Sequence, residues 1–204
     1  MREWFEGAFA EPTAAQRRGW PPIAEGAHSL ILAPTGSGKT LAAFLWALNG
    51  IVADRIAGRP PARLLYLSPL KALNYDVERN LRGPLAGIEA VARRHGLEPP
   101  GISVAVRTGN TPQRERRRML REHPDILITT PESLYLLLTS RGTEILRGIR
   151  SVIIDEIHAV AGTKRGAHMS LSLERLQRVV EEDGGALQRI GLSATDADLV
   201  IAHV

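Results

Sequence analysis

The feature that most constrains the fold of this 204-residue chain is the segment Ala33–Thr40, with the sequence A-P-T-G-S-G-K-T. It follows the apolar run Leu30–Leu32 directly, and helix-forming residues come after it. A strand that ends in a glycine-rich loop and turns into a helix directs several backbone N–H groups at one point, as polyphosphate sites require. Gly36 and Gly38 permit turns with positive φ and a close approach of the backbone to a ligand. The segment therefore predicts a phosphate-binding loop, with Ala33 standing where the strict pattern has glycine.

The side chains at the end of this loop suit a nucleoside triphosphate with Mg²⁺. The Lys39 ammonium can reach the β- and γ-phosphates, and the Thr40 hydroxyl can bind the metal ion. The alternative is a flexible turn with a solvated lysine, which the flanking strand and helix disfavour. The predicted ATP-binding residues of the loop are Pro34, Thr35, Gly36, Ser37, Gly38, Lys39 and Thr40.

Composition restricts the class of protein. With 44% hydrophobic residues the chain can bury a full core, and with no cysteine it can form neither disulfides nor thiolate metal sites. No apolar run approaches the roughly 20 residues of a membrane span, and no signal peptide is visible, so we expect a cytoplasmic protein without a membrane partner. The net charge of +4 favours an anionic partner only mildly.

Short apolar runs alternate with helical patterns along the chain. This alternation predicts a doubly wound, mostly parallel α/β sheet with helices on both faces, whose ligands gather at the carboxyl ends of the strands. The expected strands are 29–33, 64–67, 103–106, 126–129, 152–154 and 190–192. The clearest expected helices are 41–56, 74–95, 111–122, 133–139 and 168–182. We expect a single domain over residues 1–195.

Two adjacent acids, Asp155 and Glu156, end the apolar strand that precedes them. That position places both carboxylates at the edge of the sheet where the phosphate loop also ends. Asp155 suits a Mg²⁺ ligand, and Glu156 suits the group that orients and deprotonates the attacking water. The plainer interpretation is a helix cap beside a solvated glutamate.

Together the motifs resemble the first, RecA-like motor lobe of superfamily 2 helicases of the DExH-box type. The phosphate loop, the acidic box Asp155–His158 and the later Ser193-Ala194-Thr195 occur in the family's order. The segments Ser68–Leu73, Thr130–Leu134 and Ala161–His168 are similar to those of the large helicase-related (Lhr-type) branch. The resemblance implies a RecA-like P-loop NTPase fold, ATP and Mg²⁺ as cofactors, and a 3′–5′ DNA helicase associated with the nucleoid and DNA repair.

The resemblance also assigns roles upstream and downstream of the loop. Gln16 matches the glutamine that recognises adenine, but Thr13-x-x-Gln16 is equally a capping box, and the two roles are compatible. Ser193 and Thr195 match the residues that couple hydrolysis to movement between lobes. His158 is expected to join them, although a histidine after a strand is commonly only a structural hydrogen-bonding group.

Contacts to a single strand, DNA in preference to RNA, are expected from loops that follow the other strands. Hydroxyls, backbone N–H groups and lysine suit phosphates and carry no base information, so binding should be independent of sequence. Taken singly, each loop could be an ordinary βα-turn. The predicted nucleic-acid-binding residues are Pro69, Lys71, Arg107, Thr108, Gly109, Thr130, Pro131, Glu132, Ser133, Lys164 and Arg165.

Two further features stay open on sequence alone. The charge run Arg114–Arg118 distributes arginines around several helix faces, so we interpret it as solvated surface. Trp4, Phe5 and Phe9 suit either stacking on adenine or packing, and the sequence does not decide between them.

The resemblance implies a second motor lobe, because superfamily 2 enzymes bind ATP between two lobes and the second supplies transition-state arginines. Residues 196–204 do not match the family's usual continuation, and no second-lobe motif follows in this chain. We therefore expect a partner lobe from a longer chain or a separate polypeptide. The alternative is a stand-alone nucleotide- and strand-binding module with negligible turnover.

Overall fold

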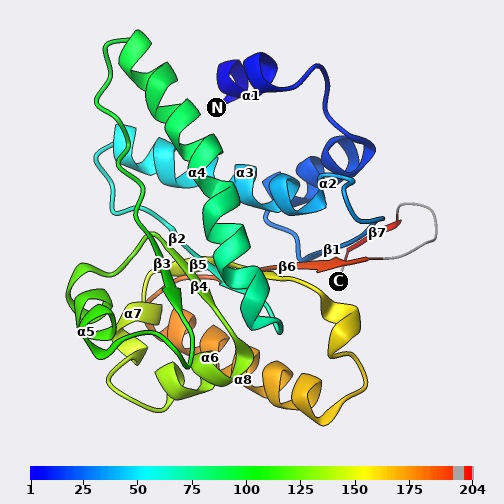
Figure 1. The fold of residues 1–204 in the computed structure, drawn as a ribbon, viewed down its shortest axis with the longest axis vertical. Helices are drawn as coiled ribbons and strands as arrows, with labels where there is room; N and C mark the ends of the chain where they lie inside the picture. Colours follow the sequence, from blue (N-terminus) through cyan, green and yellow to red (C-terminus); the bar gives the residue numbers. More distant parts are fainter. Residues whose placement is uncertain (195–199, 204) are drawn as a thin grey trace.

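A seven-stranded sheet forms the centre of the structure, a computed structural model that describes residues 1–194 and 200–203, with only the backbone described at 71–73 and 200–203. The strand order is β3-β4-β2-β5-β6-β1-β7 (Figure 1). Strands β1 to β6 are parallel, and β7 pairs with β1 in antiparallel fashion. The strands are β1 (Ser29–Leu32), β2 (Arg63–Leu67), β3 (Val104–Arg107), β4 (Ile126–Thr129), β5 (Ile149–Ile154), β6 (Gln188–Ser193) and β7 (Val200–His203).

Helices cover both faces of this sheet. In Figure 1, α1, α2 and α3 lie above the sheet and α5 to α8 below it, whereas α4 crosses in front of the strands. The buried α4 residues Leu81 and Ile88 belong to the same core cluster as α3, so α4 is counted with the first group. The first group comprises α1 (Arg2–Ala8), α2 (Ala14–Ala24), α3 (Lys39–Ile56) and α4 (Lys71–Arg94). The second comprises α5 (Gln113–Glu122), α6 (Pro131–Leu138), α7 (Thr143–Leu146) and α8 (Lys164–Glu182), with the 3₁₀ turn η1 (Ile157–Ala159) after β5.

Because successive side chains of a strand point to opposite faces of the sheet, the core consists of two layers, one on each face. In β2, Tyr66 packs with the layer under α3, whereas Leu65 and Leu67 pack with the layer under α6 and α8. The central strands are buried on both faces, as expected for a covered parallel sheet, so they appear in the sequence as continuous apolar runs rather than alternating ones.

The predicted fold is confirmed: a doubly wound, mostly parallel α/β sheet contains all six expected strands and all five expected helices. Strand β7 and the helices α1, α2 and α7 were not among the expected elements, although the capping box Thr13-x-x-Gln16 lies at the start of α2. The helix expected from Thr111 begins instead at Gln113, because the Thr111 side chain bonds to the preceding loop. Within the described residues, no helix is both long and apolar enough to cross a membrane.

Polar caps end the loops at the carboxyl edge of the sheet. Helix α6 begins after Thr130, whose hydroxyl accepts from the Ser133 N–H at 3.4 Å, and Pro131 occupies the first helical position. Helix α8 begins after Thr163, whose hydroxyl accepts from the Gly166 N–H at 3.1 Å. These caps orient helix N-termini, with their free N–H groups, toward the same edge as the phosphate loop.

Candidate active site

The loop after β1 has the backbone geometry that phosphate binding needs. Gly36 and Gly38 both adopt φ of 80°, which is strained for residues other than glycine. Gly38 also caps α3, so that helix begins at Lys39 with its first N–H groups open to the loop. Lys39 is 6% exposed and its Nζ donates to the Pro34 carbonyl at 3.3 Å across the loop.

One atom of this loop is evidence for a polar ligand that does not depend on the sequence motif. Ser37 Oγ is buried and has no hydrogen-bond partner among the described residues. A buried hydroxyl without a partner is costly, and a phosphate oxygen would satisfy it. The loop therefore fits an anion on structural grounds.

Gln16 packs directly against the phosphate loop. The side chain is 3% exposed, and a Cβ added at Gly38 would lie 2.9 Å from its Nε2 atom. Its Oε1 accepts from the Thr13 N–H at 2.9 Å, while Thr13 Oγ1 accepts from the Gln16 N–H at 3.3 Å. The capping box is thus present, and it holds the amide beside the loop. Recognition of adenine by Gln16 stays a prediction.

The two acids lie where β5 ends, as the spacing predicted. Asp155 is 5% exposed; its Oδ1 accepts from the Glu156 N–H at 2.8 Å, and its Oδ2 accepts from the Tyr66 hydroxyl. Glu156 has φ of 51°, in the left-handed region that residues with side chains rarely adopt. This turn separates the two carboxylates, so each acid has its own set of partners.

Glu156 is linked to β6 through His158. Glu156 Oε2 lies 3.2 Å from His158 Nε2, and His158 Nδ1 lies 3.1 Å from Ser193 Oγ. The histidine therefore connects Glu156, the predicted catalytic base, with Ser193 of the predicted coupling motif. The third predicted coupling residue, Thr195, lies outside the described residues.

A cavity of about 600 Å³ joins the loop and the acids. Its walls come from Thr35 to Leu41 with the exception of Ser37, from Asp155 and Glu156, and from the side of α4 that includes Asp76 and Asn80. Thr40 and Asp155 both face this space. Because Mg²⁺ is held by few protein ligands together with substrate phosphates, one hydroxyl and one carboxylate fit it. The described residues contain no cluster of three or more acids and histidines that could hold a metal without a nucleotide.

Tyr66 is the residue of this site that the sequence motifs missed. It is fully buried, and burial together with the Asp155 charge raises the pKa of its hydroxyl, which therefore stays a donor. The signal that could have identified it is a single phenol among the leucines at the carboxyl end of β2.

Hydrogen bonds within the protein hold the loop after β3, which is one of those predicted to bind single-stranded nucleic acid. Arg107 is 8% exposed and donates to the Thr108 carbonyl at 2.6 Å, and burial lowers the pKa of its guanidinium. Arg116, from the charge run interpreted as surface, donates to the carbonyls of Thr111 at 2.7 Å and Gly109 at 2.8 Å. Arg116 is half-buried and supports the loop, whereas Arg114, Arg117 and Arg118 are exposed, in line with the surface interpretation.

Burial also limits which atoms of the other loops could reach a strand. Thr108, Thr130, Ser133, Pro69 and Pro131 are all buried, so contacts there would come largely from the backbone. The Lys71 side chain is not among those described.

Arg165 and Glu132 form a forked pair. Arg165 Nε donates to Glu132 Oε1 at 2.6 Å and its Nη2 to Oε2 at 3.1 Å. The hydrogen bond from Arg165 lowers the pKa of Glu132. These two residues, both predicted to contact nucleic acid, thus join α6 to α8.

Comparison with known proteins agrees with this geometry. The family model for the DEAD/DEAH box helicases matches residues 13–200. The chain belongs to the DEAD/DEAH box helicase family. The Lhr helicase/probable uracil glycosylase of Mycolicibacterium smegmatis is 58% identical over 194 residues, and the Lhr helicase/uracil glycosylase of Escherichia coli is 54% identical over 200. Each alignment covers 95% of this helicase domain and 13% of the relative.

A solved structure gives the same result. The Mycobacterium smegmatis helicase Lhr bound to ssDNA and AMP-PNP matches with a TM-score of 0.89 and 57% identity, over 97% of this chain and 24% of that one. The resemblance to the Lhr-type branch, and the RecA-like fold, are thereby confirmed. This helicase domain spans a small part of the length of these relatives.

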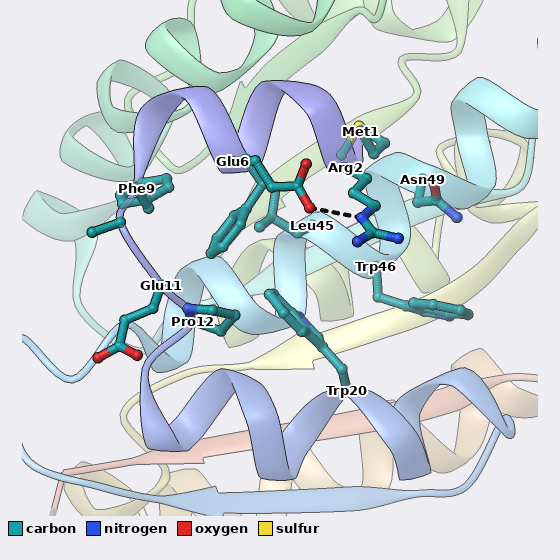
Figure 2. Close-up of a pocket in the computed structure, with 12 residues that line it drawn as sticks. Met1, Arg2, Glu6, Phe9, Glu11, Pro12, Trp20, Leu45, Trp46 and Asn49 are labelled. Carbon is teal, nitrogen blue, oxygen red and sulfur yellow. Dashed lines mark hydrogen bonds and ion pairs between the residues drawn. The ribbon is translucent and has the colours of Figure 1, made fainter.

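A second cavity of about 490 Å³ adjoins the cavity beside the phosphate loop and shares Phe9 with it. It is lined mainly by apolar side chains of α1, α2 and α3, with the Arg2–Glu6 pair at 2.7 Å on its rim (Figure 2). Phe5 lies 5.0 Å from Phe9 and 5.4 Å from Trp20 between ring centroids, and Trp4 packs edge-on against Phe9. Trp4 and Phe5 therefore pack, whereas Phe9 is 40% exposed and also faces the cavity beside the phosphate loop.

Proposed function

We propose that this chain is the ATP-binding lobe of an ATP-dependent DNA helicase that couples hydrolysis to 3′–5′ movement along a single strand. The observation that carries the proposal is the cavity in which the phosphate loop, Thr40 and the Asp155–Glu156 pair meet. The relative bound to ssDNA and AMP-PNP supports both ligands. Association with the nucleoid and a role in DNA repair belong to the same proposal.

In this proposal the residues of the cavity divide the work. Lys39 and the backbone of residues 34–40 bind the phosphates, and Gln16 recognises the base. Asp155 and Thr40 hold Mg²⁺, which when bound neutralises charge on the phosphoryl oxygens. Glu156 accepts a proton from the attacking water. Because His158 contacts both residues, a change in the charge or position of Glu156 also affects Ser193 on β6.

A second lobe is part of the proposal, because arginines supplied from outside such a site are worth about 10³–10⁵ in rate. The alternative is a stand-alone nucleotide- and strand-binding module with negligible turnover. Strand-stimulated ATPase, measured on this chain with and without an added second lobe, separates the two. Stimulation only with the added lobe supports the motor; no turnover in either case supports the module.

Nucleotide binding itself is tested with Lys39→Ala. Loss of a charge-assisted phosphate contact of about 1.5–3 kcal/mol should weaken affinity for Mg²⁺-nucleotide by roughly tenfold or more. Arg178→Ala removes one positive charge from the exposed surface of α8 and serves as control. Equal affinities for Lys39→Ala and the parent in a calorimetric titration would contradict the proposed site.

A further inference from the structure

The Tyr66 hydroxyl binds the acid at the centre of the proposed metal site. Tyr66 and Ile153 are partners in the β2–β5 register, and the Asp155 N–H donates to the Leu67 carbonyl at 2.9 Å. Because side chains alternate along a strand, Tyr66, Ile153 and Asp155 face the same side of the sheet. The phenol therefore reaches forward past the end of β5, where it donates to Asp155 Oδ2.

Among the residues that the structure describes, each oxygen of Asp155 has one protein donor. Oδ2 accepts from Tyr66, and Oδ1 accepts from the Glu156 N–H at 2.8 Å. An ionised carboxylate has about four acceptor sites, so two remain for a cation or its water. Donors on both oxygens hold the carboxylate against rotation, which fixes the direction in which the remaining sites point.

Tyr66 is itself held by the helix that carries the phosphate loop. Its ring stacks on Phe44 with centroids 5.2 Å apart and an angle of 22°. Phe44 lies one turn after Thr40 on α3, so both residues lie on the same side of that helix. Tyr66 thus joins the helix that bears Thr40 to the strand end that bears Asp155, and all four residues line one cavity.

We propose that Tyr66 is a positioning residue that orients the Asp155 carboxylate for the Mg²⁺ of a bound nucleotide. This inference rests on the proposed function, because it assigns a role within the same site. Groups that orient a metal ligand from behind are worth about 10- to 100-fold in metal affinity or activity. A phenol that serves only to fill the core would leave the Mg²⁺ requirement unchanged.

Tyr66→Phe tests this, because it keeps the stacked ring and removes one oxygen. The measurement is the affinity of the purified chain for AMP-PNP by calorimetry, across a series of MgCl₂ concentrations and in excess EDTA. We expect the half-effective Mg²⁺ concentration to rise about tenfold, with affinity in EDTA equal to that of the parent. Tyr135→Phe is the control: it removes the same atom from a 37% exposed ring on α6, which belongs to the opposite face of the sheet.

A double-mutant cycle tests whether Tyr66 affects Mg²⁺ binding through the Asp155 carboxylate. If Tyr66 acts through Asp155, adding Tyr66→Phe to Asp155→Asn should cause no further change in the Mg²⁺ dependence. Equal losses in both backgrounds, or a Mg²⁺ dependence of Tyr66→Phe that matches the parent, overturns the inference while leaving the proposed function intact. A parent chain that binds no Mg²⁺-AMP-PNP overturns the proposed function and this inference with it.

Discussion

His158 Nδ1 lies 3.1 Å from Ser193 Oγ, which places a hydrogen bond between the acidic box after β5 and the end of β6. The other ring nitrogen of His158 lies 3.2 Å from Glu156 Oε2. One imidazole therefore contacts both the predicted base and the predicted coupling residue. A change at Glu156 has a direct path to β6, whose neighbour β1 leads into the phosphate loop.

Ser193→Ala should separate hydrolysis from movement. In the longer protein that carries the second lobe, we expect strand-stimulated ATPase within a few-fold of the parent and a larger loss of strand displacement. Removal of one hydrogen bond should cost about 0.5–1.5 kcal/mol of unfolding free energy. Ser172→Ala is the matched control: Ser172 is also buried, and its hydroxyl donates to the His168 carbonyl at 3.0 Å, away from the site. Parallel loss of both activities in Ser193→Ala would show that the serine serves catalysis rather than coupling.

Glu156→Gln tests the proposed base. The amide keeps the size of the side chain and its left-handed backbone but cannot accept a proton, so nucleotide affinity should persist while hydrolysis falls by roughly 10²–10⁴. The measurement is single-turnover hydrolysis by the longer protein beside a binding titration. Glu181→Gln, on the exposed end of α8, controls for the loss of a surface charge. Turnover within a few-fold of the parent would mean that another group activates the water.

The Glu132–Arg165 fork should make stability depend on pH in the acid range. Because the fork lowers the pKa of Glu132, its contribution is complete above the unfolded value near 4.5 and is lost as the pH falls through the lower folded value. The pair is partly exposed, so solvent screens the effect and it should be small. Urea unfolding from pH 7 to pH 3 should show the parent more stable than Glu132→Gln at pH 7, with the difference shrinking below about pH 4.5. A constant difference would mean that the charge of Glu132 contributes nothing.

The sheet and its helices could be predicted from the sequence because short aliphatic runs and helical periodicity are local signals. Strand β7 was missed because it is an edge strand that pairs with β1, which lies far away in the sequence, and such a pairing leaves no local signal. The same applies to the side-chain pairs. Neither Tyr66 with Asp155 nor Arg165 with Glu132 follows from spacing, since each joins elements that meet only once the strand order is known. The catalytic and binding roles themselves remain predictions.

Arg116 offers the sharpest test of how the loop after β3 binds a strand. Its guanidinium holds the carbonyls of Gly109 and Thr111, whereas that of its neighbour Arg117 is on the exposed surface of α5. Arg116→Ala and Arg117→Ala each remove one positive charge from the same helix, so their long-range electrostatic effects on a strand should be similar. Only Arg116→Ala also releases the loop, at about 0.5–1.5 kcal/mol for each lost hydrogen bond. We therefore expect Arg116→Ala to weaken single-strand binding by roughly tenfold, and Arg117→Ala by less than about threefold, at the same salt concentration. Fluorescence anisotropy with a labelled oligothymidine, repeated with a mixed sequence, measures both. Equal losses in the two variants would show that the run acts through its charge alone and that the loop does not bind the strand.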